Sequence, residues 1–189
     1  MSASASAPDS QYDKSLLKSC GEDVFISNRV EIRRPHLVSV GSHVAIDSGV
    51  YVTTALEMGD YIHIAPYVTI IGGPTGLVTL DHFSGIAAGC RIICGTDEYL
   101  GHGLVGHTMP EQYRDNVIIK PVKFERFTSI GTNVVVMPGV TIAEGSIVGS
   151  NSLVTKSTEP WTVYVGTPAR PVKSRPSEKM LRYAREMGY

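Results

Sequence analysis

Four histidines and one acidic pair in this sequence could move protons or hold a polar substrate. His63 and His82 stand in regular stretches of the chain, whereas His102 and His107 stand in an irregular stretch that follows Asp97-Glu98. A histidine can take up a proton near neutral pH, and a carboxylate can orient that histidine or bind an amine. We therefore treat His82, His63 and Asp97 as candidates for general-base chemistry.

A second group of residues, near the C-terminus, could bind phosphate groups. Arg170, Lys173 and Arg175 follow directly on the turn sequence Gly166-Thr167-Pro168-Ala169. Arginine can contact two phosphate oxygens at once, and lysine acts as a point charge. The alternative is a solvated basic tail without a ligand.

The elements that must position these residues follow a repeat of six. Every sixth residue is apolar in three runs that start at Val40, Leu80 and Ile118, and a second column lies four residues after the first. Spacings of two and four place both columns on one side of an extended chain, and intervening Gly, Asp, Asn and Pro residues bend it. The pattern predicts short strands stacked in an all-β fold, a parallel β-helix.

The repeat divides the chain into three parts. Residues 1–20 are expected to form an N-terminal tail or short lead-in, residues 21–170 the β-helix, and residues 171–189 a basic segment with a short helix. Within the β-helix the period is lost over residues 95–117, which predicts an extended loop. A loop of this length in a compact domain is often functional, although a tolerated surface insertion is the alternative.

Composition and charge narrow the class of protein further. The 189 residues include 17 Lys+Arg and 18 Asp+Glu, and the net charge of -1 argues against a dedicated nucleic-acid binder. No stretch approaches 18 apolar residues, so no membrane span is expected. The start, MSASASAPDS, lacks the pattern of a secretory signal and is expected to be mobile. An odd cysteine count of 3 fits a reducing, cytoplasmic setting.

Several motifs resemble those of the hexapeptide-repeat acyltransferase family. They are Ile130-Gly131-Thr132-Asn133-Val134-Val135, Val148-Gly149-Ser150-Asn151-Ser152-Leu153, Pro138-Gly139-Val140-Thr141-Ile142 and the ending Tyr164-Val165-Gly166-Thr167-Pro168-Ala169-Arg170. The resemblance covers about residues 22 to 175 and implies a left-handed β-helix that assembles as a homotrimer with active sites between subunits. It also implies an acetyl-CoA-dependent acetyltransferase that acts on a hydroxyl or amino group of a sugar or nucleotide sugar, in surface-polysaccharide (O-antigen) synthesis.

The resemblance also implies where acetyl-CoA, the co-substrate, binds. In this family it lies between two subunits along the last coils, with backbone amides on the pantetheine, a turn on the adenine and basic residues on the phosphates. The matching positions are Gly131, Ser150, Lys156, Gly166, Thr167, Pro168, Ala169, Arg170, Lys173 and Arg175.

Family patterns also bear on the acceptor site. Counted back in hexapeptides from Pro138, His82 matches the base of sugar N-acetyltransferases, whereas Asp97 stands where galactoside-type O-acetyltransferases have a histidine. The run Gly95 to Gly101 resembles the loop of a subgroup that acylates dideoxy-aminosugar nucleotides or O-antigen sugars, which tends to have the His63-Ile64 pair. We expect His82 or His63 as base and Asp97 to orient it or bind the acceptor. The expected substrate contacts are Glu98, Tyr99, His102 and His107.

Three other functions are compatible with this fold. One is O-acetylation of an antibiotic or other small hydroxyl compound. A second is a γ-class carbonic anhydrase, because His102 and His107 have the five-residue spacing of two of its zinc ligands, but no third histidine is well placed. The third is a non-catalytic trimeric scaffold. We expect the acetyltransferase and no metal, and oxygen and nitrogen acceptors remain equally open.

Overall fold

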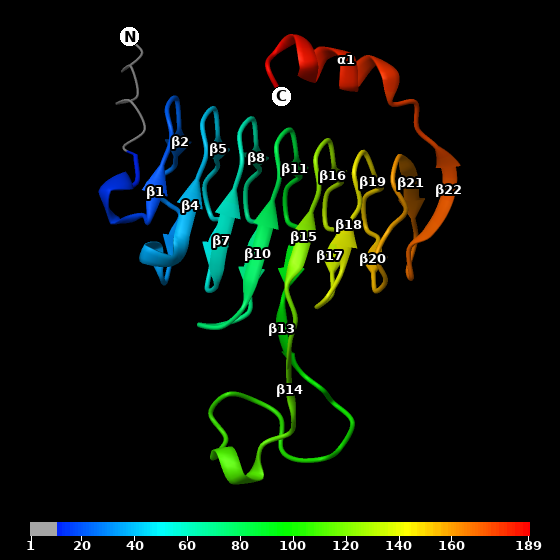
Figure 1. Cartoon of the computed structure of the whole chain (residues 1–189). Helices are drawn as coiled ribbons and strands as arrows, with labels where there is room; N and C mark the ends of the chain where they lie inside the picture. Colours follow the sequence, from blue (N-terminus) through cyan, green and yellow to red (C-terminus); the bar gives the residue numbers. More distant parts are fainter. Residues whose placement is uncertain (1–10) are drawn as a thin grey trace, which may run out of the picture.

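The computed structural model describes residues 11–189, and the segment MSASASAPDS, expected to be mobile, lies outside the described residues. The chain winds into a parallel β-helix whose short strands form three sheets (Figure 1). The short strands follow from the sequence, because turn residues interrupt the apolar columns about every six positions. None of the helices in the described part of the chain is long and apolar enough to cross a membrane.

Each complete coil contributes one strand to each of the three sheets, neighbouring coils pair in parallel, and the second sheet gains two further strands at the C-terminal end. The first sheet contains β1 (Ser19–Cys20), β4 (Val38–Val40), β7 (Ala55–Met58), β10 (Leu77–Leu80), β15 (Val122–Phe124) and β18 (Thr141–Ile142). The second contains β2 (Phe25–Ile26), β5 (Ala45–Ile46), β8 (His63–Ile64), β11 (Gly85–Ile86), β16 (Ser129–Ile130), β19 (Ile147–Val148), β21 (Thr162–Val165) and β22 (Arg170–Ser174). The third contains β3 (Glu31–Ile32), β6 (Tyr51–Val52), β9 (Thr69–Ile71), β12 (Arg91–Ile93), β17 (Val135–Val136) and β20 (Leu153–Val154).

Both apolar columns point into the coil. Ile46 and Ile64 pair across β5 and β8 and are buried, as are Val44 and Ile62 of the second column. Ile118 is the exception, and its assignment to the first column was wrong. It lies in β14 (Val117–Ile119), which pairs antiparallel with β13 (Gly95–Asp97) outside the coil, so its place in the period is coincidental.

The loss of period over residues 95–117 corresponds to an excursion that leaves the coil after the third sheet (Figure 1). Its stem is the antiparallel pair β13 and β14, and its tip contains the 3-10 helix η3 (Glu111–Tyr113). At the N-terminal end of the coil, β1 pairs with β4. At the C-terminal end, the basic segment forms β22, which pairs antiparallel with β21. The remaining 3-10 helices are η1 (Lys14–Leu16) and η2 (Pro35–Leu37).

Aromatic rings stack along the corner between the first and second sheets. His43, Tyr61, Phe83 and Phe127 follow one another at centroid distances of 4.6, 5.3 and 5.2 Å, and Trp161 continues the row at 5.8 Å. All five have positive φ angles, and the stacking offsets the cost of that conformation. We call these five residues the aromatic corner.

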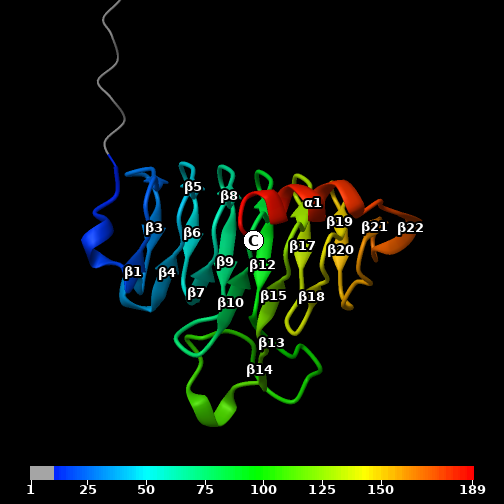
Figure 2. The same ribbon diagram turned by 45° about the horizontal axis from the view of Figure 1, so that its top comes forward.

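The C-terminal helix α1 (Glu178–Glu186) lies across the turns of several coils (Figure 2). Met180 and Ala184 of the helix line an apolar hollow together with Phe83 and Phe127 of the aromatic corner. The last residue, Tyr189, packs edge-on against Phe83 at a centroid distance of 5.1 Å. The helix therefore covers one corner of the coil.

Candidate functional site

A cavity of about 500 Å³ lies where the excursion leaves the coil, and we call it the excursion cavity. Its ionisable lining residues are Arg33, Arg34, Asp97, His107 and Arg114. The arginines at 33 and 34 follow β3 of the third sheet, whereas the other three belong to the excursion. The cavity therefore joins a coil corner to the excursion and has an excess of positive charge around one carboxylate.

Asp97 is the last residue of β13, and its side chain is 16% exposed. Its Oδ1 atom lies 3.8 Å from Nε of Arg114, which is too long for a hydrogen bond. Both atoms are buried and have no hydrogen-bond partner. Buried polar atoms without a partner are rare in folded proteins, and each calls for an explanation such as a catalytic role or a bound water or ion.

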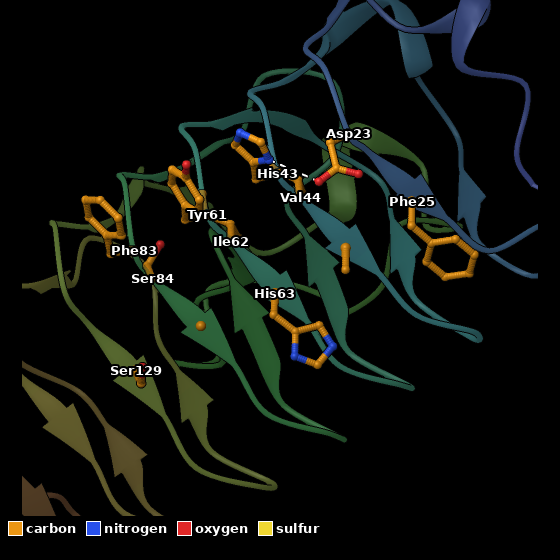
Figure 3. A pocket seen from close by; sticks show the side chains of 12 residues that line it. Asp23, Phe25, His43, Val44, Tyr61, Ile62, His63, Phe83, Ser84 and Ser129 are labelled. Carbon is orange, nitrogen blue, oxygen red and sulfur yellow. Dashed lines mark hydrogen bonds and ion pairs between the residues drawn. The ribbon is translucent and has the colours of Figure 1, made fainter. Parts of the chain in front are cut away.

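His63 stands on the outer face of the second sheet and points away from the coil (Figure 3). Its Nε2 atom lies 2.8 Å from Oδ2 of Asp47, and both side chains border open solvent. A cavity of about 500 Å³ extends from His63 to the His43–Asp23 pair, in which Nδ1 and Oδ2 are 3.1 Å apart. A histidine held by a carboxylate in this way is suited to accept a proton.

Asp47 was missed in the sequence, although its position could have been found. Ile46 and Ile64 are 18 residues apart, which is the length of one coil, and they pair across adjacent strands. Asp47 directly follows Ile46, and His63 directly precedes Ile64. The two side chains are therefore diagonal neighbours on adjacent strands, a relation that a search for strict multiples of six does not detect.

His82 lies on the corner between the first two sheets, beneath the C-terminus. Its Nδ1 accepts the backbone N–H of Asp60 at 2.8 Å, so the neutral ring carries its hydrogen on Nε2. The ring also packs against Tyr189 at a centroid distance of 4.9 Å. With its acceptor nitrogen in use, this histidine is poorly suited to act as a base.

Asp60 connects this corner to the end of the chain. Burial alone would raise the pKa of its carboxyl, but hydrogen bonds from the Ser42 amide and the Tyr189 hydroxyl, with the nearby His82 and His43, bring it below the usual value. The Tyr189 hydroxyl donates to Oδ2 of Asp60 at 2.7 Å. That hydrogen bond, followed by partial burial, raises the pKa of Tyr189 to about 12.

The three catalytic candidates therefore occupy three places in one subunit. No hydrogen bond or ion pair joins His63, His82 and Asp97 to one another within residues 11–189 of the structure. Asp97 faces Arg114, and the carboxylate that orients His63 is Asp47.

Comparison with known proteins gives the chain its family. The chain is 33% identical over 167 residues to the dTDP-4-amino-4,6-dideoxy-D-glucose acyltransferase of Escherichia coli, an alignment that covers 87% of this chain and 85% of that protein. The chain belongs to the hexapeptide-repeat acyltransferase family. It is an acyltransferase, and this membership decides against the carbonic anhydrase and scaffold alternatives. No protein-family model matches the chain.

Solved structures of acyltransferases agree with this membership. AntD, an N-acyltransferase from Bacillus cereus in complex with dTDP and 3-hydroxybutyryl-CoA, superimposes with a TM-score of 0.89 and 31% identity over 95% of this chain and 97% of that chain. The hexapeptide-repeat acetyltransferase VCA0836 from Vibrio cholerae, complexed with acetyl coenzyme A, has a TM-score of 0.58 and 22% identity over 87% of this chain and 74% of that chain. The latter likeness concerns the fold alone.

The predicted acceptor contacts of this acyltransferase gather around the excursion. Glu98 Oε2 accepts a hydrogen bond from Asn116 Nδ2 at 3.0 Å and lies 3.4 Å from Nδ1 of His102. Tyr99 is exposed next to Thr96, and His107 lines the excursion cavity. The structure brings only Glu98 and His102 into direct contact.

Several residues predicted to bind the cofactor lie along the turns between the second and third sheets. Gly131 follows β16, Ser150 follows β19, and Gly166 follows β21, so the three residues occupy adjacent coils. Ser150 and the Thr167-Pro168 pair are exposed. These turns form a continuous edge of the acyltransferase, as a long ligand would require.

The predicted basic residues do not all lie on this edge. Arg170, Lys173 and their neighbour Ala169 are in or next to β22, close to it, whereas Lys156 follows β20 on a different corner. Arg175 donates to the carbonyl oxygens of Phe127 and Gly145 at 2.9 and 2.8 Å. Arg175 therefore ties the last segment to the coil, and its guanidinium is occupied.

Proposed function

We propose that this acyltransferase transfers an acetyl group from acetyl-CoA to the amino group of a nucleotide-linked amino sugar. The E. coli relative is named for such an acceptor, and AntD is an N-acyltransferase that was solved with dTDP and an acyl-CoA. The observation that carries the proposal is the position of Asp97, a partly buried carboxylate in a cavity whose lining also includes three arginines. That carboxylate would accept an N–H of the sugar amine.

The reaction is a direct attack in a ternary complex. The amine lone pair forms a bond to the thioester carbonyl carbon, and a backbone N–H would stabilise the oxyanion. The C–S bond then breaks, CoA leaves as the thiolate, and the nitrogen loses one proton to yield the amide. Our choice for the group that takes up this proton is His63 of the neighbouring subunit of a homotrimer, oriented by Asp47, because His63 and Asp97 are not in contact within one subunit and His82 has its acceptor nitrogen engaged.

The nucleotide would bind to the cationic side of the excursion cavity. Arg33 and Arg34 line the cavity from one coil corner, where Arg33 pairs with Glu31 at 3.2 Å and Arg34 donates to the Thr53 carbonyl oxygen at 2.6 Å, and Arg114 lines it from the excursion. A diphosphate carries the negative charge that such a group of guanidinium ions accommodates. The sugar would then extend toward Asp97, and Glu98, Tyr99, His102 and His107 would surround it.

Acetyl-CoA would lie along the exposed turns that contain Gly131, Ser150 and Gly166, with its phosphates near Arg170 and Lys173. The neighbouring subunit of a homotrimer would form the other wall of this groove. The apolar surface that the excursion exposes supports such an assembly, because large exposed apolar patches usually mark contact sites. No nucleic-acid partner is proposed.

The cellular setting is also a proposal. The structure has three free cysteines, and burial raises the pKa of the Cys90 and Cys94 thiols, so neither is an activated nucleophile. Free cysteines are typical of reducing compartments. We therefore propose a cytoplasmic enzyme that prepares an acetylated sugar nucleotide for a surface polysaccharide such as an O-antigen.

Thermal unfolding with CoA, and with dephospho-CoA as the comparison, tests the cofactor part of this proposal. A ligand at 100 times its dissociation constant adds about 2.7 kcal/mol to the apparent stability. We expect a clear rise in Tm with CoA, a smaller one with dephospho-CoA, and loss of that difference in Arg170→Ala. Arg182→Ala, on the exposed face of α1, is the matched control. No shift at millimolar CoA would contradict the proposal.

A further inference from the structure

Three potential metal ligands meet in the excursion just beyond the β13–β14 stem, on the side away from the coil. Glu98 and His102 follow β13, whereas Asp115 precedes β14, so the group links the two arms of the excursion. One ligand atom from each residue lies within 4.8 Å of the other two. The arms are also joined by the hydrogen bond from the Glu98 amide to the carbonyl of Asn116, at 2.9 Å. The backbone therefore holds the side chains close to one another.

Asp115 gives an independent indication that a ligand is required here. Its side chain belongs to a residue that is only 3% exposed. One carboxylate oxygen, Oδ1, accepts the Asn116 amide at 2.8 Å, but Oδ2 is buried and has no partner. No ion pair reaches Asp115 from any cation in residues 11–189, since the neighbouring Arg114 faces Asp97. A buried carboxylate without a counter-charge is costly, and a cation would remove that cost.

We propose that Glu98, His102 and Asp115 bind one divalent metal ion, with Zn²⁺ or Mn²⁺ as the class that fits best. Two carboxylates and one imidazole suit these ions, whereas Mg²⁺ and Ca²⁺ prefer oxygen ligands alone. Ligand atoms around such an ion lie roughly 3.4 Å apart, given bonds of about 2.1 Å. The ligand atoms, which lie within 4.8 Å of one another, would therefore move closer together on binding. The His102 side chain, which is 61% exposed, is free to make that movement.

The metal would fasten the two arms of the excursion to each other. Asp97 and Arg114 are the direct neighbours of Glu98 and Asp115, so the same clip would fix the two ionic groups that line the excursion cavity. Metal binding by these residues does not depend on the proposed function, and only the benefit of the metal for catalysis rests on it. The site differs from the zinc pair considered in the sequence, because it uses His102 without His107.

Metal binding is measured on the whole protein, without CoA or acceptor, so the result does not depend on the proposed function. After treatment with EDTA and its removal, the protein is titrated with ZnCl₂ and with MnCl₂ by calorimetry. We expect one saturable site, with affinity at least about 10-fold lower in His102→Ala and in Asp115→Asn. His107→Ala is the matched control and is expected to bind as the native protein does. Because His102 is exposed, its variant stays interpretable if Asp115→Asn unfolds.

A second readout is cleavage by trypsin at Arg114, the only lysine or arginine within residues 98–115. Metal is expected to slow this cleavage in the native protein and in His107→Ala, but not in His102→Ala. The proposal is overturned if no saturable binding occurs, if affinity is unchanged in both ligand variants, or if His107→Ala loses the metal equally. In that last case the zinc pair of His102 and His107 would be the site.

Discussion

The coil and the excursion differ in which side chains they bury and which they expose. In the coil, the apolar columns are buried and each strand pairs with a strand of the next coil, so the same arrangement recurs from coil to coil. In the excursion, large apolar side chains are exposed: Tyr99, Leu100, Leu104, Val105, Tyr113, Val117 and Ile119. Within residues 11–189, the buried side-chain polar atoms without a partner are also all in the excursion: Asp97 Oδ1, Arg114 Nε and Asp115 Oδ2.

This difference separates the part of the chain whose apolar and polar groups find partners within one subunit from the part whose groups do not. The coil buries its apolar columns, whereas the excursion exposes apolar side chains and contains buried polar atoms that lack a hydrogen-bond partner. A neighbouring subunit would cover the apolar surface, and substrate or metal would supply the missing partners of the polar atoms. Changes in the core of the coil should therefore lower stability, whereas changes in the excursion should lower activity with little effect on stability, and the first two predictions below test that division.

The largest effect on stability is expected in the coil. Ile64 is fully buried, so Ile64→Ala should lower the free energy of unfolding by about 2–5 kcal/mol. Ile119→Ala removes the same atoms from a side chain in the excursion stem that is 42% exposed, and should cost about 0.5 kcal/mol or less. Chemical denaturation of both variants measures the two values. Equal losses would break the division between coil and excursion.

A smaller effect, on activity alone, is expected in the excursion. Asp97→Asn removes the charge that we propose holds the amine, and a hydrogen bond to a charged group contributes about 1.5–3 kcal/mol. The kcat/KM for the amino sugar should fall roughly 10- to 100-fold, while Tm stays close to the native value. Glu111→Gln, an exposed acidic residue in η3, is the control for charge in the excursion. Native activity in Asp97→Asn would remove this residue from the site.

The loss of protein stability at low pH should depend partly on Asp60. Its folded-state pKa is lowered, so its contribution is present above the unfolded value near 3.8 and is lost as the pH falls through the folded value. The native protein should therefore lose more stability than Asp60→Asn between about pH 5 and pH 2. Tm measured across that range for both proteins tests the expectation, and parallel curves would contradict it.

The smallest effect is expected at the end of the chain. The pKa of Tyr189 is raised to about 12, so its hydrogen bond to Asp60 stabilises the protein fully below the ordinary tyrosine value near 10. That contribution should be lost as the pH rises from 10 toward 12. Tyr189→Phe should lack this part of the alkaline decline, and Tyr183→Phe, at a half-exposed position of α1, should retain it. Tm between pH 9 and pH 12 is the measurement.

Periodicity predicted the coil well because one rule, an apolar residue facing inward, acts at every turn. The same rule misplaced Ile118, since an exposed stem can match a period by coincidence. It also could not reveal the aromatic corner, because His43 and Tyr61 stack across coils at turn positions that follow no apolar pattern. Contacts of that kind depend on which turns become neighbours, and this is known only once the length of each coil is known.

The site was predicted less completely for the same reason. Asp97 and His107 line the same cavity, although a role for them in a site stays a prediction. The carboxylate that orients His63 is Asp47, from the preceding coil, and Lys156 lies on a different corner from Gly131. Each of these relations is set by how coils and corners align, and the residues alone do not specify it.

Transfer of the acetyl group itself tests the central claim most directly. Purified protein is incubated with acetyl-CoA and either dTDP-4-amino-4,6-dideoxyglucose or the corresponding sugar nucleotide with a hydroxyl in place of the amine, and products are separated and weighed by mass spectrometry. The account predicts an acetylated product from the amine, formed at least about 100-fold faster than from the hydroxyl compound, and strongly reduced in Asp97→Asn. Equal rates with both acceptors, or no transfer to the amine by protein that binds CoA, would contradict it.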